Sequence, residues 1–335
     1  MNKDNKLKTK INSNNIKNFL KENLKSIIIM IVFIVVVNIP LPYYIEAPGG
    51  TINLTERIDE NYDKKNGSLN MLYVTQFKGN PVTMLLGAIF PRWDINEISN
   101  QQISNETAEE IYIRNRVMLD NSIQNATFVA YNHAGIKIDV KEQKHIVLAT
   151  VKNNGLEIGD IIKSIDNKQI TNVNEIRDII NSKNKGDKLN ILIERKEKEE
   201  TITIEIEEDK LLGVTIITNY EYELPNELNI NFRSGEGGSS GGLILSLGIY
   251  SEITGIDILK GRNVAGTGTI DSNGNVGQID GIKYKIAGAV KDKMDVILVS
   301  PYNYEEAKQV VKDNNYDIEL VEVSTFEEAI NYLTK

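Results

Sequence analysis

The sequence predicts a mixed α+β protein that begins with one N-terminal transmembrane helix. Three observations support this class: a charge-free apolar stretch at residues 26–45, a β-rich unit at residues 140–208, and alternating strand and helix patterns from residue 210 onward. The chain has 335 residues, of which 41% are hydrophobic and 25% are charged, an ordinary balance for a globular protein. This length favours about two to three domains.

Composition excludes several classes of function. The net charge of −9 argues against a nucleic-acid partner, because nucleic-acid binding needs a basic surface. The absence of cysteine excludes disulfides, thiolate metal sites and a cysteine nucleophile. The sequence contains no G-x-x-x-x-G-K-[ST] motif for a nucleotide, no H-E-x-x-H and no other metal-ligand spacing. We therefore expect no cofactor, no metal and no nucleotide.

The N-terminal region predicts membrane attachment. Residues 26–45 are apolar and uncharged, and a membrane span needs about 20 such residues. The positive-inside rule places residues 1–25 in the cytoplasm and all residues after 45 outside, with Tyr43 and Tyr44 at the far interface. A cleaved signal peptide is the alternative, but no small-x-small site follows the apolar run, so a retained single-pass anchor in the lipid bilayer is favoured. The basic residues behind this orientation are Lys3, Lys6, Lys8, Lys10, Lys17, Lys21 and Lys25.

After the anchor, the pattern predicts a strand at residues 68–74, a polar loop at 94–107 and a helix at about 109–131, which contains no Gly or Pro. In the β-rich unit we expect a strand at 145–151 and a helix from residue 173. Two further strands, KLNILIER and ETITIEI, are joined by a charged turn at 196–200.

The C-terminal part, residues 210–335, alternates strands and helices as α+β and α/β domains do. We expect a strand in LLGVTIIT, a glycine-rich turn at 235–242 and a helix from residue 243. A strand at 264–270 leads to a hairpin turn at 271–274. The remaining elements are a helix at about 282–293, a strand in DVILVS, a helix at 304–312, a strand in IELVEV and a terminal helix at 326–333.

The β-rich unit resembles a PDZ domain. The resemblance rests on Gly155-Leu156-Glu157-Ile158-Gly159-Asp160-Ile161-Ile162 and on the following Ser164-Ile165-Asp166-Asn167. It implies a peptide groove bordered by the strand at residues 144–151, with Ile146, Val147 and Leu148 as groove residues. We expect this strand to form the free sheet edge to which an extended peptide is added.

The C-terminal part resembles the proteolytic domain of Lon-type proteases. Gly237-Gly238-Ser239-Ser240-Gly241-Gly242-Leu243 is similar to the nucleophile motif Gly-Pro-Ser-Ala-Gly. Thr267-Gly268-Thr269-Ile270, Gly274, Val276 and Gly281-Ile282-Lys283-Tyr284-Lys285 are similar to the second motif of that family. The resemblance implies Ser240 as the nucleophile, Lys285 as the base and Thr267 as a support for the lysine. Ser239 replaces the usual Pro and Gly241 the usual Ala, so Ser239 remains a rival nucleophile.

Together the two segments make the chain similar to the PDZ-containing, Lon-like membrane serine proteases of low-GC bacteria. Lon-type domains usually begin well before the nucleophile. We therefore expect residues 46–130 and 210–335 to form one protease domain, interrupted by a PDZ-like domain at 131–209. Residues 1–25 and 26–45 are the predicted cytoplasmic tail and transmembrane helix.

The chemistry of the expected dyad follows from its residue types. A serine hydroxyl needs a base, and neither His133 nor His145 lies near the motif. Lysine serves only when neutral, so it must be buried to lower its pKa. Lys283 and Lys285 both lie close to an apolar helical stripe, so periodicity leaves the choice between them open. Backbone N–H groups around Gly238, Ser239 and Ser240, just before a helix, are suited to an oxyanion.

The resemblances imply an ATP-independent serine endopeptidase, anchored in the membrane, that cleaves peptides or flexible protein segments outside the cytoplasm. Its partners would be those substrates and the lipid bilayer, and the PDZ-like unit would present the substrate. The alternative is a catalytically weak or inactive PDZ scaffold at the cell surface, which the departures at Ser239 and Gly241 leave open.

Overall fold

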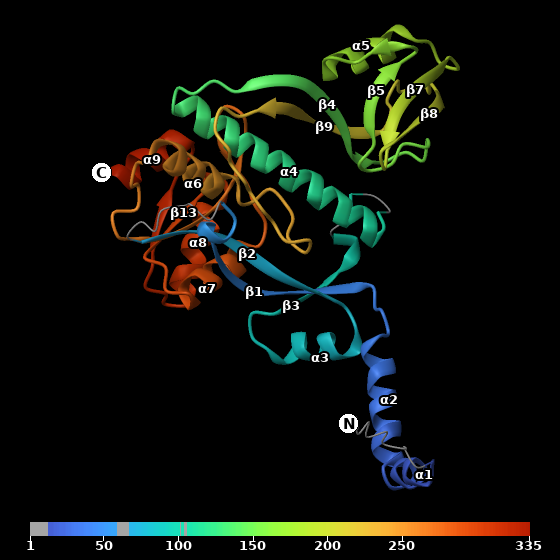
Figure 1. Ribbon diagram of the computed structural model, residues 1–335, viewed down its shortest axis with the longest axis vertical. Coiled ribbons are helices and arrows are strands. Elements are labelled where there is room, and N and C mark those ends of the chain that lie inside the picture. Colours follow the sequence, from blue (N-terminus) through green and yellow to red (C-terminus); the bar gives the residue numbers. More distant parts are fainter. Residues whose placement is uncertain (1–12, 59–66, 101, 104–105) are drawn as a thin grey trace, which may run out of the picture. The chain divides into compact units, whose positions relative to one another are not determined.

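The computed structural model describes residues 13–58, 67–100, 102, 103 and 106–335 (Figure 1). The chain divides into two compact units. The smaller unit contains the residues up to Glu46 together with Gln76–Ile98, and the larger contains Ala47–Thr75 and Ser99–Lys335. The fold mixes helices and strands, as the sequence predicts.

The smaller unit contains short helices and strand ends. Helices α1 (Ser13–Glu22) and α2 (Leu24–Val37) precede the start of strand β1 (Tyr43–Asn53), which pairs antiparallel with β3 (Asp94–Glu97). Helix α3 (Pro81–Ile89) begins at a capping box of Asn80 and Thr83, with Pro81 in its first turn. Strand β3 and the single-turn helix η2 (Ile98–Asn100) lie within residues 94–107, which the sequence analysis assigned to a loop.

The predicted transmembrane helix at residues 26–45 is corrected by this part of the structure. Helix α2 has 14 residues and ends at Val37, with Asn38 as its C-cap. Pro40 and Pro42 follow, and they prevent the helix from continuing because proline is not accommodated in a helix interior. Strand β1 begins at Tyr43. Of the helices that the structure describes, none combines the length and the apolar character needed to cross a membrane. The tail at residues 1–12 lies outside the described residues.

The larger unit is built on a sheet with strands in the order β14-β13-β10-β2-β1. Strand β10 (Asn263–Thr267) is parallel to β2 (Ser68–Lys78) and to β13 (Val296–Val299), which is parallel to β14 (Glu319–Glu322). Residues 68–78 therefore share a sheet with residues that follow the β-rich unit. The predicted strand at 264–270 is divided between β10 and the short β11 (Thr269–Ile270), which forms a hairpin with β12 (Val276–Gly277).

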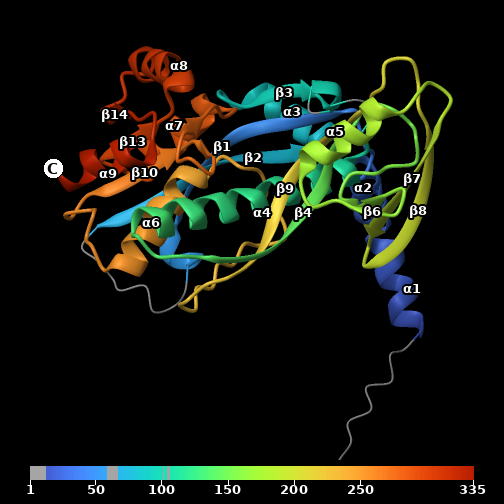
Figure 2. The same cartoon turned by 90° about the horizontal axis from the view of Figure 1, so that it is seen from above.

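Helices cover both faces of this sheet. Alternate strand residues point to opposite faces, so Val264 and Leu298 belong to one core cluster and Ala265 and Ile297 to another. The first cluster also contains residues of α4 (Ala108–His133), α6 (Gly242–Thr254) and α9 (Phe326–Thr334). The second contains residues of α7 (Ile282–Lys291) and α8 (Pro301–Asp313). In both views, α4 lies alongside α6 (Figure 2).

The β-rich unit has its own sheet and core. Its strands run in the order β8-β7-β5-β4-β9, and the short β6 pairs with β5. Isoleucines and leucines from these strands and from α5 fill one hydrophobic cluster. The bounds are β4 (Asp139–Thr150), β5 (Ile161–Ile165), β6 (Lys168–Gln169), α5 (Val173–Ser182), β7 (Lys188–Arg195), β8 (Lys198–Glu205) and β9 (Val214–Glu223).

Strand β9 corrects two sequence-based expectations. The strand predicted in LLGVTIIT was placed in the protease domain, which was expected to begin at residue 210. Strand β9 begins within this sequence, at Val214. In the structure β9 is the edge strand of the β-rich sheet, so that sheet extends to Glu223. It pairs with β4 from Asp139↔Glu223 to Thr150↔Val214 (Figure 1). Strand β4, the expected free edge, therefore lies between β9 and β5, which pairs with it at His145 and Ile146.

Candidate active site

The glycine-rich segment before α6 is fixed to strand β10 through the backbone of Ser240. The Ser240 carbonyl oxygen accepts hydrogen bonds from the Gly268 N–H (2.9 Å) and from the Thr267 hydroxyl (3.2 Å). In return, the Leu243 N–H donates to the Gly268 carbonyl at 3.1 Å. These bonds join the predicted nucleophile motif to the Thr-Gly of the second motif.

Helix α4 holds the opposite side of the same segment. The Gly238 N–H donates to the Asn115 carbonyl (2.8 Å), and the Ser122 hydroxyl donates to the Ser239 carbonyl (3.1 Å). Arg116 Nη1 donates to the Glu236 carbonyl at 3.1 Å. The sequence analysis predicted this helix but assigned none of these contacts to the site, because no local pattern connects α4 to a turn so far along the chain.

Lys285 is buried on the first turns of α7. Its side chain is 3% exposed, and its Nζ donates to Thr267 Oγ1 at 3.0 Å. Burial lowers the Lys285 pKa from 10.5 to about 8, against an opposing effect of Asp280. Lys283 is exposed, with its Nζ 4.9 Å from the centroid of the Tyr284 ring. The structure thus separates two lysines that helical periodicity does not distinguish.

Thr267 connects the lysine to the serine segment. Its hydroxyl accepts from Lys285 Nζ and donates to the Ser240 carbonyl, and the side chain is fully buried. A hydroxyl has one donor and two acceptor positions, so it can make both bonds at once. The hydroxyl therefore fixes the amine relative to the residue that carries the predicted nucleophile.

Backbone N–H groups for an oxyanion are present beside Ser240. Helix α6 begins at Gly242, with Gly241 as its N-cap. Within the described part of the chain, the N–H groups of Ser239, Ser240 and Gly241 have no hydrogen-bond acceptor. Free N–H groups before a helix suit a developing negative charge.

Gly238 differs from its predicted role. Its own N–H is bonded to Asn115, so the direct oxyanion role is corrected to a structural one. Gly238 has a φ of +89°, a conformation that favours glycine. Ser239 and Ser240 are both half-buried, so exposure does not choose between them as nucleophile. The bonds from Thr267 and Gly268 are made to Ser240.

The second predicted site, the groove of the PDZ-like unit, is corrected. Ile146 pairs with Ile161 on one side and with Ile217 on the other, and Val147 is opposite Ile216. Leu148 lies at a bulge in the β4–β9 ladder. Ile146 and Val147 therefore do not offer a free edge on the β9 side, because β9 of the same chain pairs with them.

Both histidines have structural surroundings. The His133 ring packs edge-on against Tyr250 and Phe326. His145 is fully buried, with its Nδ1 3.1 Å from the Thr218 hydroxyl. Among the residues that the structure describes, no group of His, Asp and Glu side chains could hold a metal ion.

Comparison with known proteins assigns both parts of the chain. Residues 134–206 match the PDZ domain family, and residues 232–335 match the Lon protease (S16) C-terminal proteolytic domain. The chain is 30% identical over 95 residues to the Lon protease of Neorickettsia sennetsu, a match that covers 28% of this chain and 11% of that relative. The chain thus spans only a small part of the relative's length.

Two of the solved structures similar to part of this chain come from Listeria. One is the PDZ domain of the SdrC-like protein of Listeria monocytogenes, with 26% identity, a TM-score of 0.20, and coverage of 22% of this chain and 86% of that one. The other is the second domain of the Listeria protein Lin2157, with 26% identity, a TM-score of 0.19, and coverage of 26% and 89%.

These domains define the class as a serine peptidase of the S16 type. More specifically, the chain combines a PDZ domain with a proteolytic domain of the Lon type.

Proposed function

We propose that the chain is a serine endopeptidase in which Ser240 is the nucleophile and Lys285 the general base. The observation that carries this proposal is the buried Lys285 amine, bonded to Thr267, whose hydroxyl in turn bonds the Ser240 carbonyl. A lysine buried in this way is neutral in a useful pH range, and its lone pair can accept a proton.

The reaction follows from these groups. Neutral Lys285 takes the Ser240 hydroxyl proton as the oxygen attacks the substrate carbonyl, and the free N–H groups at Ser239–Gly241 stabilise the oxyanion. The lysine ammonium then gives its proton to the leaving amine, which leaves an ester on Ser240. Water attacks this ester with Lys285 again as base, and the acid product and free serine are released. No nucleotide enters any step.

The substrate class follows from the absence of a nucleotide motif in the sequence. Without an ATP-driven motor, the enzyme would act on peptides, flexible tails or segments that are already unfolded. The direct test is incubation of the full chain with an unstructured polypeptide such as casein, in buffer that contains EDTA and no nucleotide. Cleavage is expected. Activity that appears only after ATP is added would contradict the proposal.

We also propose that the apolar segment around α2 holds the chain at a membrane, with the catalytic part outside the cytoplasm. The support is chemical: α2 has no buried residue, most of its apolar side chains are exposed, and lysines dominate the residues before it. Fractionation of cells should place the chain with the membranes, and protease added to intact spheroplasts should degrade the catalytic part. A chain found in the soluble fraction would contradict this location.

The PDZ domain offers a different edge from the one the sequence suggested. Two side chains of α4 bind the backbone of β9: Gln124 accepts from the Tyr220 N–H (2.6 Å), and Asn121 donates to the Thr218 carbonyl (3.3 Å). Helix α4 therefore covers the outer edge of β9 at these residues. Farther along the strand, Val214 and Ile216 pack against the same core as α5. We propose that an extended substrate segment adds to the β9 edge at residues 214–216.

A shortened chain tests this presentation role. Lys144 and Asn219 are directly paired, so an Asn-Gly turn between them can replace residues 145–218 and keep the rest of the β4–β9 ladder. Tyr220 then retains its bond to Gln124. We expect KM for casein to rise several-fold, while kcat/KM for a short fluorogenic peptide is retained.

The folded state of the shortened chain would be checked by circular dichroism. If a folded variant lost activity equally on casein and on the short peptide, the domain would brace the protease rather than present substrate. A deletion of residues 140–208, the unit outlined from the sequence, would be a poorer test because it leaves β9 without its partner strand.

A further inference from the structure

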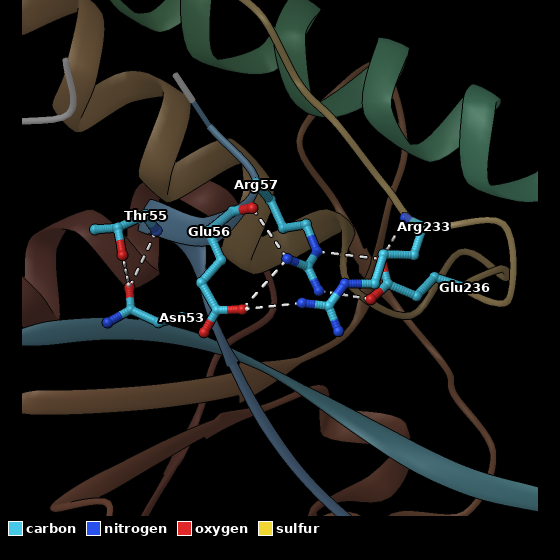
Figure 3. A network of polar contacts seen from close by, with 6 residues as sticks. All are labelled: Asn53, Thr55, Glu56, Arg57, Arg233 and Glu236. Carbon is cyan, nitrogen blue, oxygen red and sulfur yellow. Dashed lines mark hydrogen bonds and ion pairs between the residues drawn. The ribbon is translucent and has the colours of Figure 1, made fainter. Parts of the chain in front are cut away.

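Arg57 makes a buried ion pair with the segment that carries the nucleophile. Its side chain is 4% exposed, and its guanidinium forms a bidentate contact with Glu236 through Nε to Oε2 (3.1 Å) and Nη2 to Oε1 (2.6 Å) (Figure 3). Its Nη1 donates to the Glu56 carbonyl at 2.9 Å. Glu236 Oε2 also accepts from the Arg233 N–H at 2.9 Å. Paired contacts of this kind fix geometry as well as charge.

The position of Arg57 is itself fixed by the protease core. Its carbonyl accepts from the Asn231 N–H (2.8 Å), and the next residue, Ile58, bridges to Ile230. Leu54 and Ile58 pack against α6 at Gly248, where an added Cβ would lie 2.3 Å from Leu54 Cδ1. The backbone that carries Arg57 is therefore packed against α6, the helix that follows the predicted nucleophile.

Glu236, at the start of the nucleophile segment, is bonded both to Arg57 and to helix α4. Its side chain is bonded to Arg57, and its carbonyl is bonded to Arg116 of α4. Between Glu236 and Ser240 the chain reads Gly237-Gly238-Ser239, and glycine has more backbone freedom to lose than any other residue. The fixed position of Glu236 therefore adds to the bonds that Gly238 and Ser239 make to α4 in restricting this short stretch.

We propose that the Arg57–Glu236 pair is a positioning device that sets the conformation of the Ser240 segment for catalysis. This inference rests on the proposed role of Ser240 and names residues that take no part in the chemistry. The pair fixes the start of the segment at Glu236, and bonds from Thr267 and Gly268 fix Ser240. These two anchors orient the backbone N–H groups of Ser239 and Ser240 toward the expected position of the oxyanion. Loss of this alignment lowers the rate of serine acylation and leaves substrate affinity unchanged.

The test compares Arg57→Lys and Glu236→Gln with the wild-type full chain. Arg57→Lys keeps the positive charge but loses the bidentate contact of the guanidinium with Glu236. Glu236→Gln keeps the shape of the side chain but loses its negative charge. We expect kcat for a short fluorogenic peptide, and the rate of Ser240 labelling by a fluorophosphonate probe, to fall about 10- to 100-fold. KM is expected to stay within about twofold, and the pH midpoint that Lys285 sets is expected to stay unchanged, because neither variant touches that lysine.

Arg195→Lys is the matched control. Arg195 makes a bidentate pair with the buried Asp160 in the β-rich unit, at 2.7 Å for both contacts, and neither residue contacts the Ser240 segment. We expect Arg195→Lys and Arg57→Lys both to lower the melting temperature, because each breaks a bidentate ion pair. Arg195→Lys is expected to leave kcat for the short peptide unchanged.

The outcomes separate the two proposals. If wild type neither cleaves the peptide nor reacts with the probe, the proposed function fails. If wild type is active and both Arg57→Lys and Glu236→Gln keep the wild-type kcat, the pair is only a structural ion pair and the inference is overturned. Should Arg57→Lys fail to fold, Glu236→Gln decides alone, and kcat near the wild-type value in that variant overturns the inference.

Discussion

Ser240→Ala and Lys285→Met should each reduce peptide cleavage by roughly 10⁴-fold or more, because each removes one member of the proposed two-residue catalytic unit. The double variant should be no less active than either single variant, since such effects are not additive. Lys285→Met leaves an apolar side chain of similar length in a buried position, so the melting temperature should not fall. Steady-state cleavage of a short fluorogenic peptide and thermal unfolding measure the two effects.

Two controls address the alternatives that the sequence leaves open. Lys283→Met changes an exposed lysine on the same helix and should keep wild-type activity. Ser239→Ala removes the rival hydroxyl and keeps both the backbone N–H and Ser240, so substantial activity should remain. The register of the dyad would be wrong if Lys283→Met were inactive and Lys285→Met active. Full activity of Ser240→Ala would favour Ser239 as the nucleophile, whereas a wild-type chain without activity would favour the scaffold alternative.

The motifs that predict the site are local in sequence. The residues from Thr267 to Lys285 lie within one stretch of sequence, and the fold joins them through a bond between two side chains 18 positions apart. Helical periodicity left Lys283 and Lys285 equivalent, since each lies near the apolar stripe. Burial against the sheet distinguishes them, and burial depends on which strands pack under α7.

The supports of the site could not be predicted because they are distant in sequence. Glu236 and Arg57 are 179 positions apart, and neither residue belongs to a motif. The same limit affected β9. Its apolar pattern predicted a strand, but alternation says nothing about which strand will be its neighbour. Because β9 pairs with β4, it belongs to the β-rich sheet and not to the protease part. The same pairing occupies the edge that was predicted as the peptide groove at Ile146–Leu148.

The apolar run at residues 26–45 shows a different limit. Hydropathy over the run predicted one continuous span, but hydropathy does not register where a helix ends. Asn38, Pro40 and Pro42 end the helical part, and the residues from Tyr43 onward pair as a strand with Glu97 and its neighbours. These local breakers were visible in the sequence and outweigh the apolar composition.

Peptide cleavage should rise with pH and level off above pH 8. Only neutral Lys285 can accept the serine proton, and burial lowers its pKa to about 8. Below that value kcat/KM should fall by about tenfold for each pH unit, so activity at pH 6 should be on the order of 100-fold below the plateau. The profile would be recorded between pH 6 and pH 10 with the short peptide, with Lys283→Met expected to give the same midpoint.

The same titration predicts the pH dependence of stability. Because the folded-state pKa of Lys285 lies below the unfolded value of 10.5, the unfolded chain binds more protons between about pH 8 and pH 10.5. The free energy of unfolding should therefore receive a contribution from Lys285 that increases with pH across this window, and Lys285→Met should remove that contribution. Denaturant unfolding of both proteins at pH 7.5 and pH 9.5 isolates it. A cleavage profile with its midpoint near 10.5, together with equal pH dependence of unfolding in both proteins, would show that Lys285 is not the buried base.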